Sequence, residues 1–263
     1  MRMTRIKAAG LFLAVTFPAA GALGAAQPAT RIPAEVVQLT QFGPAVGVGV
    51  VALLWPGLVR ALFAGRGHGR PARLDPALAV TAVLITTASA AAYGVLSGDV
   101  RFTRPSALEH PFALIVVAQL IGACGEEIGW RCFLQPLLRT RFGPLASSVA
   151  VGAVWGAWHV QVFAQDPVYA GAFLLGAVSM SVVLGWALEE VAGTGTRLLL
   201  AGGFHALVNL GMLLFMDEES GAVPPMVLFG ASCLVAAVVW TVARARRAPA
   251  RIQPTSPTLE HVR

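Results

Sequence analysis

Uncharged, apolar runs recur along almost the whole length of the 263-residue chain. Most of them hold about 19–24 residues, enough for a helix that rises about 1.5 Å per residue to cross a hydrocarbon core of about 30 Å. The run at 111–125 is too short alone and becomes a full span when it is extended through a charged motif to Leu138. The runs cover residues 8–30, 36–59, 76–98, 111–125, 142–165, 167–188, 198–216 and 220–243.

This pattern predicts an all-α, polytopic membrane helix bundle with about eight transmembrane helices. In lipid a helix satisfies its own backbone hydrogen bonds, and the chain lacks the alternation of a transmembrane barrel. The composition agrees, because 56% of the residues are hydrophobic and only 12% are charged. That balance excludes an ordinary soluble globular domain.

The two ends of the chain carry separate predictions. Residues 1–109 are expected to hold three helices, and residues 216–243 the last one. The first helix has a basic start, an apolar centre and small residues, so a cleaved signal peptide stays open as an alternative. Residues 244–263 are basic and then rich in Pro, Ser and Thr, which predicts a disordered cytoplasmic tail.

The basic residues test the helix count. Eight helices with both termini on one side place fifteen basic residues on that side and three on the other. Because cytoplasmic loops carry the excess of Lys and Arg, both termini are predicted to be cytoplasmic. The larger group is Arg2, Arg5, Lys7, Arg60, Arg66, Arg70, Arg73, Arg139, Arg141, Arg197, Arg244, Arg246, Arg247, Arg251 and Arg263, and the smaller is Arg31, Arg101 and Arg104. The net charge of +6 is then explained by basic loops on the cytoplasmic side and by their contact with anionic membrane lipids. No nucleic-acid partner is expected.

Three charged residues stand inside the fourth predicted span. A charge at mid-membrane costs about 2.5–3.5 kcal/mol, so it normally faces the bundle interior and has a partner. Glu127 and Arg131 are four residues apart on one helix face and are expected to pair. Glu126 is turned by about 100° from Glu127 and needs a partner from another helix. Salt bridges that serve only packing stay open as an alternative for this stretch.

The predicted spans contain two histidines, His159 and His205, and Asn209 follows one turn after His205. Each of these alone is compatible with a hydrogen-bonded core residue. Together with Glu126 they bring polar groups from three helices to similar depths. The combination predicts a buried site that contains water.

The order of these residues resembles the CAAX prenyl endopeptidase and bacteriocin-processing family of intramembrane proteases, abbreviated CPBP or Abi. The resemblance covers about residues 110–215. It rests on Glu-Glu-x-x-x-Arg at 126–131, aromatic-x-x-x-His at 155–159 and His-x-x-x-Asn at 205–209. Two positions depart from the family pattern, Trp155 where Phe is usual and Cys132 where Gly is usual.

The resemblance implies an intramembrane endopeptidase that acts on a membrane-associated or lipidated protein or peptide. Such hydrolysis needs a water, a base and donors for the developing oxyanion. By analogy with the family, Glu126 with His159 would activate the water, while His205 and Asn209 would stabilise the oxyanion.

The resemblance also implies a protease domain at residues 110–215, in which Glu127 and Arg131 support the catalytic helix. A metal is left open. Glu126, His159 and His205 with a water form a plausible catalytic zinc set, whereas the chain lacks His-Glu-x-x-His and a metal-free glutamate mechanism is equally compatible.

The alternative function is an inactive membrane scaffold, or an ion or solute transporter that uses the same polar cluster. Transporters often carry internal repeats, and none is evident in this sequence. Arginine outnumbers lysine 18 to 1, which is typical of a GC-rich bacterial genome. We therefore expect an integral protein of a bacterial cytoplasmic membrane, whose partners are membrane lipids and a membrane-associated substrate.

Overall fold

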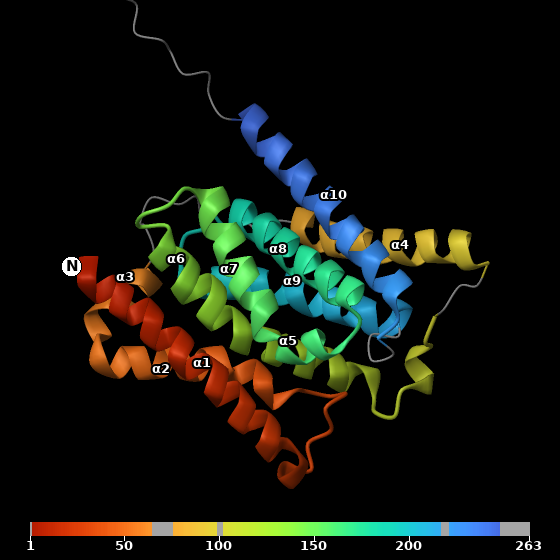
Figure 1. Cartoon of the computed structure of the whole chain (residues 1–263), viewed down its shortest axis with the longest axis horizontal. Helices are drawn as coiled ribbons and strands as arrows, with labels where there is room; N and C mark the ends of the chain where they lie inside the picture. Colours follow the sequence, from red (N-terminus) through yellow and green to blue (C-terminus); the bar gives the residue numbers. More distant parts are fainter. Residues whose placement is uncertain (1, 65–75, 99–101, 217–220, 248–263) are drawn as a thin grey trace, which may run out of the picture.

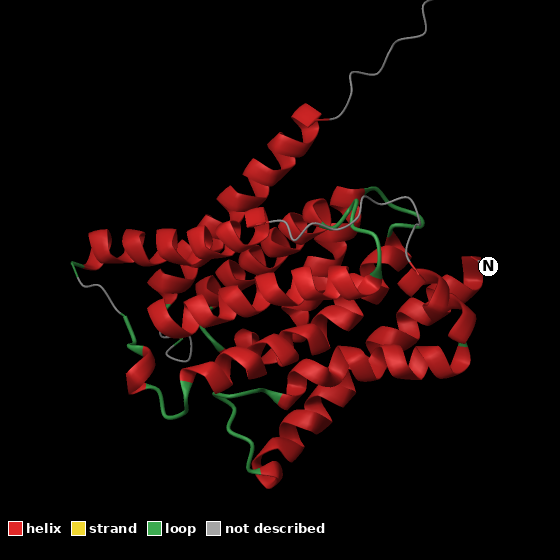
Figure 2. Cartoon of the chain, turned by 180° about the vertical axis from the view of Figure 1, so that it is seen from behind, coloured by secondary structure: helices red, strands yellow, loops and turns green. Residues whose placement is uncertain are grey.

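The computed structural model describes residues 2–64, 76–98, 102–216 and 221–247. Within these residues the elements are helices joined by loops (Figure 2), which confirms the predicted all-α class. The helices are α1 (Arg2–Thr30), η1 (Leu39–Phe42), α2 (Gly43–Leu54), α3 (Pro56–Ala64), α4 (Pro76–Ser97), η2 (Pro105–Ala107), α5 (Phe112–Gly129), η3 (Trp130–Leu134), α6 (Gln135–Leu138), α7 (Pro144–Trp158), η4 (Val160–Ala164), α8 (Pro167–Ala187), α9 (Thr194–Phe215) and α10 (Val223–Arg247). Most of the predicted tail, residues 248–263, lies outside the described residues.

Six helical segments are long and apolar enough to cross a membrane, which makes the chain an integral membrane protein. They are α1, α4, the continuous segment from α5 to α6, α8, α9 and α10. The predicted extension of the fourth span to Leu138 is therefore confirmed, because the span Phe112–Leu138 is continuous.

Two of the eight predicted spans hold shorter helices. In the run 36–59, helix α2 ends at Leu54, because Trp55 precedes Pro56 and a residue before proline is disfavoured in the α conformation. In the run 142–165, α7 begins at Pro144 and ends at Trp158, and the chain continues as the short 3-10 helix η4. Continuous hydrophobicity does not reveal such breaks.

The bundle is built from neighbouring helices that approach closely. Helix α8 packs between α7 and α10, and α5 packs against α9 (Figure 1). Small residues permit this: a Cβ added to Gly152 on α7 would lie 2.7 Å from the Cβ of Ser181 on α8. Helix α1 belongs to the same core, since the rings of Phe12 and Trp130 lie 5.5 Å apart.

The helix ends form two faces, and contacts between distant segments define the first. Arg139, after α6, pairs with Glu189, and Arg244, near the end of α10, pairs with Glu190. At the start of α9, Thr194 donates a hydrogen bond to the carbonyl oxygen of Phe63 in α3. We call this end of the bundle the basic face. The opposite end, formed by residues 31–38, 102–111 and 159–166, is called the cavity face.

Candidate active site

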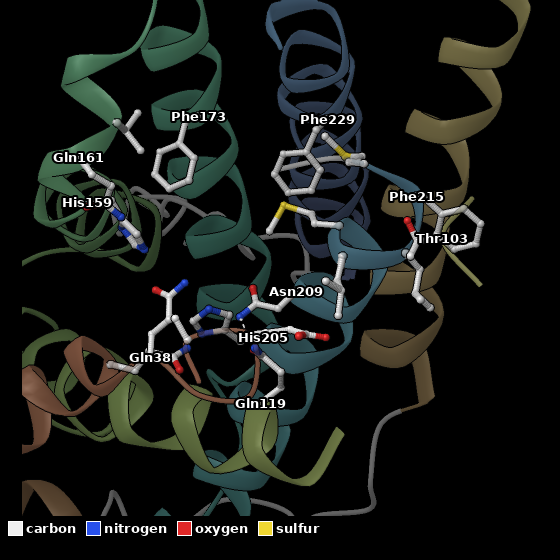
Figure 3. A pocket seen from close by; sticks show the side chains of 18 of the residues that line it. Gln38, Thr103, Gln119, His159, Gln161, Phe173, His205, Asn209, Phe215 and Phe229 are labelled. Atoms are coloured by element: carbon white, nitrogen blue, oxygen red, sulfur yellow. Dashed lines mark hydrogen bonds between the residues drawn. The ribbon is translucent and has the colours of Figure 1, made fainter. Parts of the chain in front are cut away.

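A cavity of about 1150 Å³ reaches from the cavity face into the bundle between α5, α7, α8 and α9 (Figure 3). All four residues predicted to be catalytic line it: Glu126, His159, His205 and Asn209. They come from α5, from the end of α7 and from α9. The structure therefore brings them together around one space.

Glu126 lies on α5 and is only 2% exposed. Its partner from another helix is Trp155 on α7, whose indole Nε1 donates a 2.8 Å hydrogen bond to Oε2 of Glu126. This hydrogen bond fixes the orientation of the Glu126 carboxylate. Among the described residues no donor bonds Oε1 of Glu126, which leaves this oxygen for a molecule in the cavity.

Glu127 forms a closed polar cluster with two other residues. Its Oε2 lies 3.3 Å from Nε of Arg131, so the expected pair is present, and both side chains are fully buried. Its Oε1 lies 3.0 Å from Nδ1 of His205 on α9, a contact that the sequence analysis did not predict. The Arg131 guanidinium also stacks on Trp155, 4.8 Å from the ring centroid. The Glu127 cluster, which comprises Glu127, Arg131 and His205, thus ties α5 to α9.

The helix that carries these charges is locally distorted. Residues Trp130–Leu134 (η3) are π-helical, so the turn that follows the end of α5 at Gly129 is wider than a regular α-helical turn. Such π-bulges occur often at functional sites, because they redirect side chains that a regular helix would not bring together. Here the bulge contains Arg131, the partner of Glu127.

Both histidines are held through the same ring nitrogen. Nδ1 of His159 lies 2.9 Å from the carbonyl oxygen of Trp155, and Nδ1 of His205 faces Glu127. Because both neighbours are acceptors, Nδ1 carries a proton in each ring and Nε2 is left for the cavity. The Trp155 ring lies between them, 6.0 Å from the His159 ring and 5.1 Å from the His205 ring.

Asn209 has a partner that the sequence analysis missed. Its Nδ2 donates a 3.2 Å hydrogen bond to Oε1 of Gln119 on α5. Gln119 lies seven residues before Glu126, which is two helical turns and therefore the same face of α5. The signal in the sequence was a lone amide on the helix face of Glu126, the carboxylate predicted to be catalytic.

The predicted zinc ligands do not share a coordination sphere in this structure. Glu126, His159 and His205 line one cavity, but their ligand atoms do not all lie within 4.8 Å of one another. Within the described ranges such a group is formed instead by Glu35, Glu109 and His110 at the cavity face. The chain thus contains a Glu-Glu-His group able to bind a metal, at a different place from the predicted one.

The geometry defines a class of protein: a polytopic helical membrane protein with a buried glutamate and two histidines around an internal cavity. Residues 108–211 match the family model of the type II CAAX prenyl endopeptidase Rce1-like proteins. The chain is 25% identical over 178 residues to the CAAX prenyl protease 2 of Methanococcus maripaludis, which covers 63% of this chain and 62% of that relative.

Bacterial relatives match a shorter stretch. Lysostaphin resistance protein A of Staphylococcus aureus strain MRSA252 is 25% identical over 131 residues, 50% of this chain and 30% of that relative. The protein of the same name from Staphylococcus epidermidis strain ATCC 35984 is 25% identical over 124 residues, 47% of this chain and 32% of its own length. The chain thus matches less than two thirds of each of these relatives. The similarity of residues 108–211 to the CAAX prenyl endopeptidase model supports the resemblance to the CPBP family.

Proposed function

We propose that this protein is an intramembrane endopeptidase that hydrolyses a peptide bond of a membrane-associated protein or peptide. One observation carries the proposal: a buried glutamate with one free oxygen and two histidines with free Nε2 atoms face the same cavity from three parts of the bundle. The similarity of residues 108–211 to the CAAX prenyl endopeptidases supports a proteolytic use of these groups.

Glu126 is the proposed general base. Its Oε2 is occupied by the Trp155 indole, so a water binds at Oε1 and loses a proton there as it attacks the scissile carbonyl carbon. Nε2 of His159 accepts a hydrogen bond from the second O–H of that water and so orients it, while this hydrogen stays on the attacking oxygen. The protonated Glu126 then gives its proton to the departing amine, which restores the carboxylate.

His205 and Asn209 are the proposed oxyanion stabilisers. The carboxylate of Glu127 at Nδ1 stabilises a protonated His205, whose Nε2–H can then donate to the developing oxyanion. Asn209 uses one amide hydrogen for Gln119 and has a second one for the same oxygen. Glu127 and Arg131 act as positioning residues, because they contact His205 and Trp155 rather than the cavity.

Peptide cleavage by the purified full chain in detergent tests this proposal. Wild type, Glu126→Ala and His159→Ala are compared with Glu190→Gln, a matched change in a half-exposed ion pair of the basic face. We expect cleavage by wild type and Glu190→Gln only. Equal cleavage by all four proteins would overturn the assignment, and activity lost with a chelator and recovered with zinc would replace the metal-free water mechanism with a metal-dependent one.

The inactive scaffold and the transporter remain as outcomes of the same experiment. A correctly folded wild-type protein that cleaves no peptide from a library of membrane-anchored substrates would favour the scaffold. Uptake of an ion or solute into proteoliposomes that depends on Glu126 would favour the transporter.

A further inference from the structure

The described loop residues that line the candidate active site gather at one end of the bundle. The loop residues that line the cavity come from four connections: between α1 and α2, between α4 and α5, between α7 and α8, and, through Met216, between α9 and α10. They include Glu35, Thr103, Glu109, Gln161 and Gln165. Hydrogen bonds join these connections at the same end, for example Nδ1 of His110 to Oε2 of Glu35 at 3.2 Å. The cavity therefore opens at the cavity face.

The described basic residues gather at the other end. Outside the membrane-embedded Arg131, ten of them lie at the basic face, namely Arg2, Arg5, Lys7, Arg60, Arg139, Arg141, Arg197, Arg244, Arg246 and Arg247. Only two described basic residues, Arg31 and Arg104, adjoin the cavity face. The remaining basic residues of the prediction, Arg66, Arg70, Arg73, Arg101, Arg251 and Arg263, lie outside the described ranges.

The orientation of a helical membrane protein follows this asymmetry, because Lys and Arg near the ends of the spans are retained on the cytoplasmic side. The basic face is therefore the cytoplasmic one. The two charged side chains that line the entrance, Glu35 and Glu109, are both acidic and give no opposing signal.

We propose that the catalytic cavity opens to the extracytoplasmic side, and that the substrates are peptide segments exposed there: exported, membrane-anchored peptides or outward-facing ends of membrane proteins. This inference rests on the proposed peptidase function for the identity of the ligand. The direction in which the cavity opens does not depend on it.

The walls of the cavity fit such a segment. Amide side chains line part of it, among them Gln38, Gln119 and Gln161 (Figure 3). An amide both donates and accepts, so these groups can pair with the backbone of an extended peptide. Phe173 and Phe229 line another part and can cover an apolar side chain of the same peptide.

Cysteine accessibility tests the direction. Glu109→Cys introduces a thiol at the cavity face, and Arg246→Cys introduces one at the basic face; both positions are exposed. The native Cys132 and Cys233 are buried and Cys124 is half-buried, so the wild-type chain measures the background. Intact bacterial cells that express each full chain are treated with a membrane-impermeant maleimide, before and after permeabilisation.

We expect Glu109→Cys to be labelled to the same extent before and after permeabilisation, and labelling of Arg246→Cys to rise several-fold after it. The reverse pattern would overturn the proposal, and so would equal labelling of both variants in intact cells. Outside labelling of Glu109→Cys combined with a wild type that cleaves nothing would retain the orientation and reject the peptidase.

A vesicle assay then tests from which side of the membrane the substrate reaches the active site. A membrane-impermeant peptide substrate is added to right-side-out vesicles and, separately, to inverted vesicles with the same amount of enzyme. We expect several-fold faster cleavage in the right-side-out preparation, with Glu126→Ala as the blank in both. Faster cleavage in inverted vesicles would mean that substrates arrive from the cytoplasm.

Discussion

Two adjacent carboxylates on α5 have opposite surroundings. Glu127 is completely buried and has a partner for each oxygen: Arg131 lies 3.3 Å from Oε2 as an ion pair, and Nδ1 of His205 on α9 lies 3.0 Å from Oε1. Glu126 also lies deep in the bundle, yet it lines the cavity and has a single donor, the Trp155 indole. The two side chains differ by one residue of helical rotation, about 100°. This rotation places Glu127 in contacts between helices and Glu126 at the cavity.

The difference shows how a membrane protein can tolerate a reactive carboxylate. An unpaired charge inside a membrane span is costly. The Glu127 cluster pairs the second carboxylate with Arg131 and His205, and these contacts hold α5 in place beside α9. Trp155 contacts both sides, since its N–H bonds Glu126 and its ring receives the Arg131 guanidinium. We therefore expect changes on the two sides to have separable effects on activity and stability.

The largest separation should come from Glu126→Gln. The amide keeps the shape and can still accept from Trp155, but it is no longer a base, so cleavage should fall by about 10²–10⁴-fold. The melting temperature in detergent should stay close to that of wild type. Full activity in this variant would remove Glu126 from the chemistry.

Arg131→Met should lower the stability of the protein through the environment of Glu127. It leaves the buried Glu127 carboxylate without its cation, and breaking a buried pair costs about 3–5 kcal/mol of stability. Thermal unfolding in detergent measures the loss, and the double variant Arg131→Met/Glu127→Gln should recover part of it. A melting curve identical to that of wild type would contradict the assigned role of the pair.

Trp155→Phe should give an intermediate effect. It retains an aromatic ring against both histidines and under the Arg131 guanidinium, and it removes the hydrogen bond to Glu126, worth about 1.5–3 kcal/mol for a charged acceptor. If the energy of this hydrogen bond is lost in the transition state, kcat should fall by about ten- to a hundredfold. KM should change little. Trp186→Phe is the matched control. The indole of Trp186 donates a 3.0 Å hydrogen bond to Thr241, and neither residue lines the cavity. Equal kcat values in both variants would reject a role for the Trp155 indole.

Gln119→Ala should have the smallest effect of the four. It removes a neutral hydrogen bond that orients Asn209, worth about 0.5–1.5 kcal/mol. We expect at most about a tenfold loss of kcat, since Asn209 keeps its second amide hydrogen. Measured together with Asn209→Ala, the two losses should not add; additive losses would show that Gln119 does not act through Asn209.

Much of the fold follows from local properties of the sequence. The apolar run at 167–188 coincides closely with α8, Pro167–Ala187, and the fourth predicted span is continuous to Leu138 as expected. The runs 36–59 and 142–165 were misleading, because proline and the end of α7 at Trp158 break helices without interrupting hydrophobicity. Helix length therefore depends on details that composition alone does not report.

In the candidate site, the sequence by itself determined the pair of Glu127 and Arg131, because residues four apart on a helix share a face whatever surrounds them. It also indicated which polar residues stand on which spans. Only the tertiary structure decided that His205 binds Glu127 and that Trp155 binds Glu126. These contacts depend on how each helix is rotated and how closely it approaches its neighbour, and packing along the whole interface sets both.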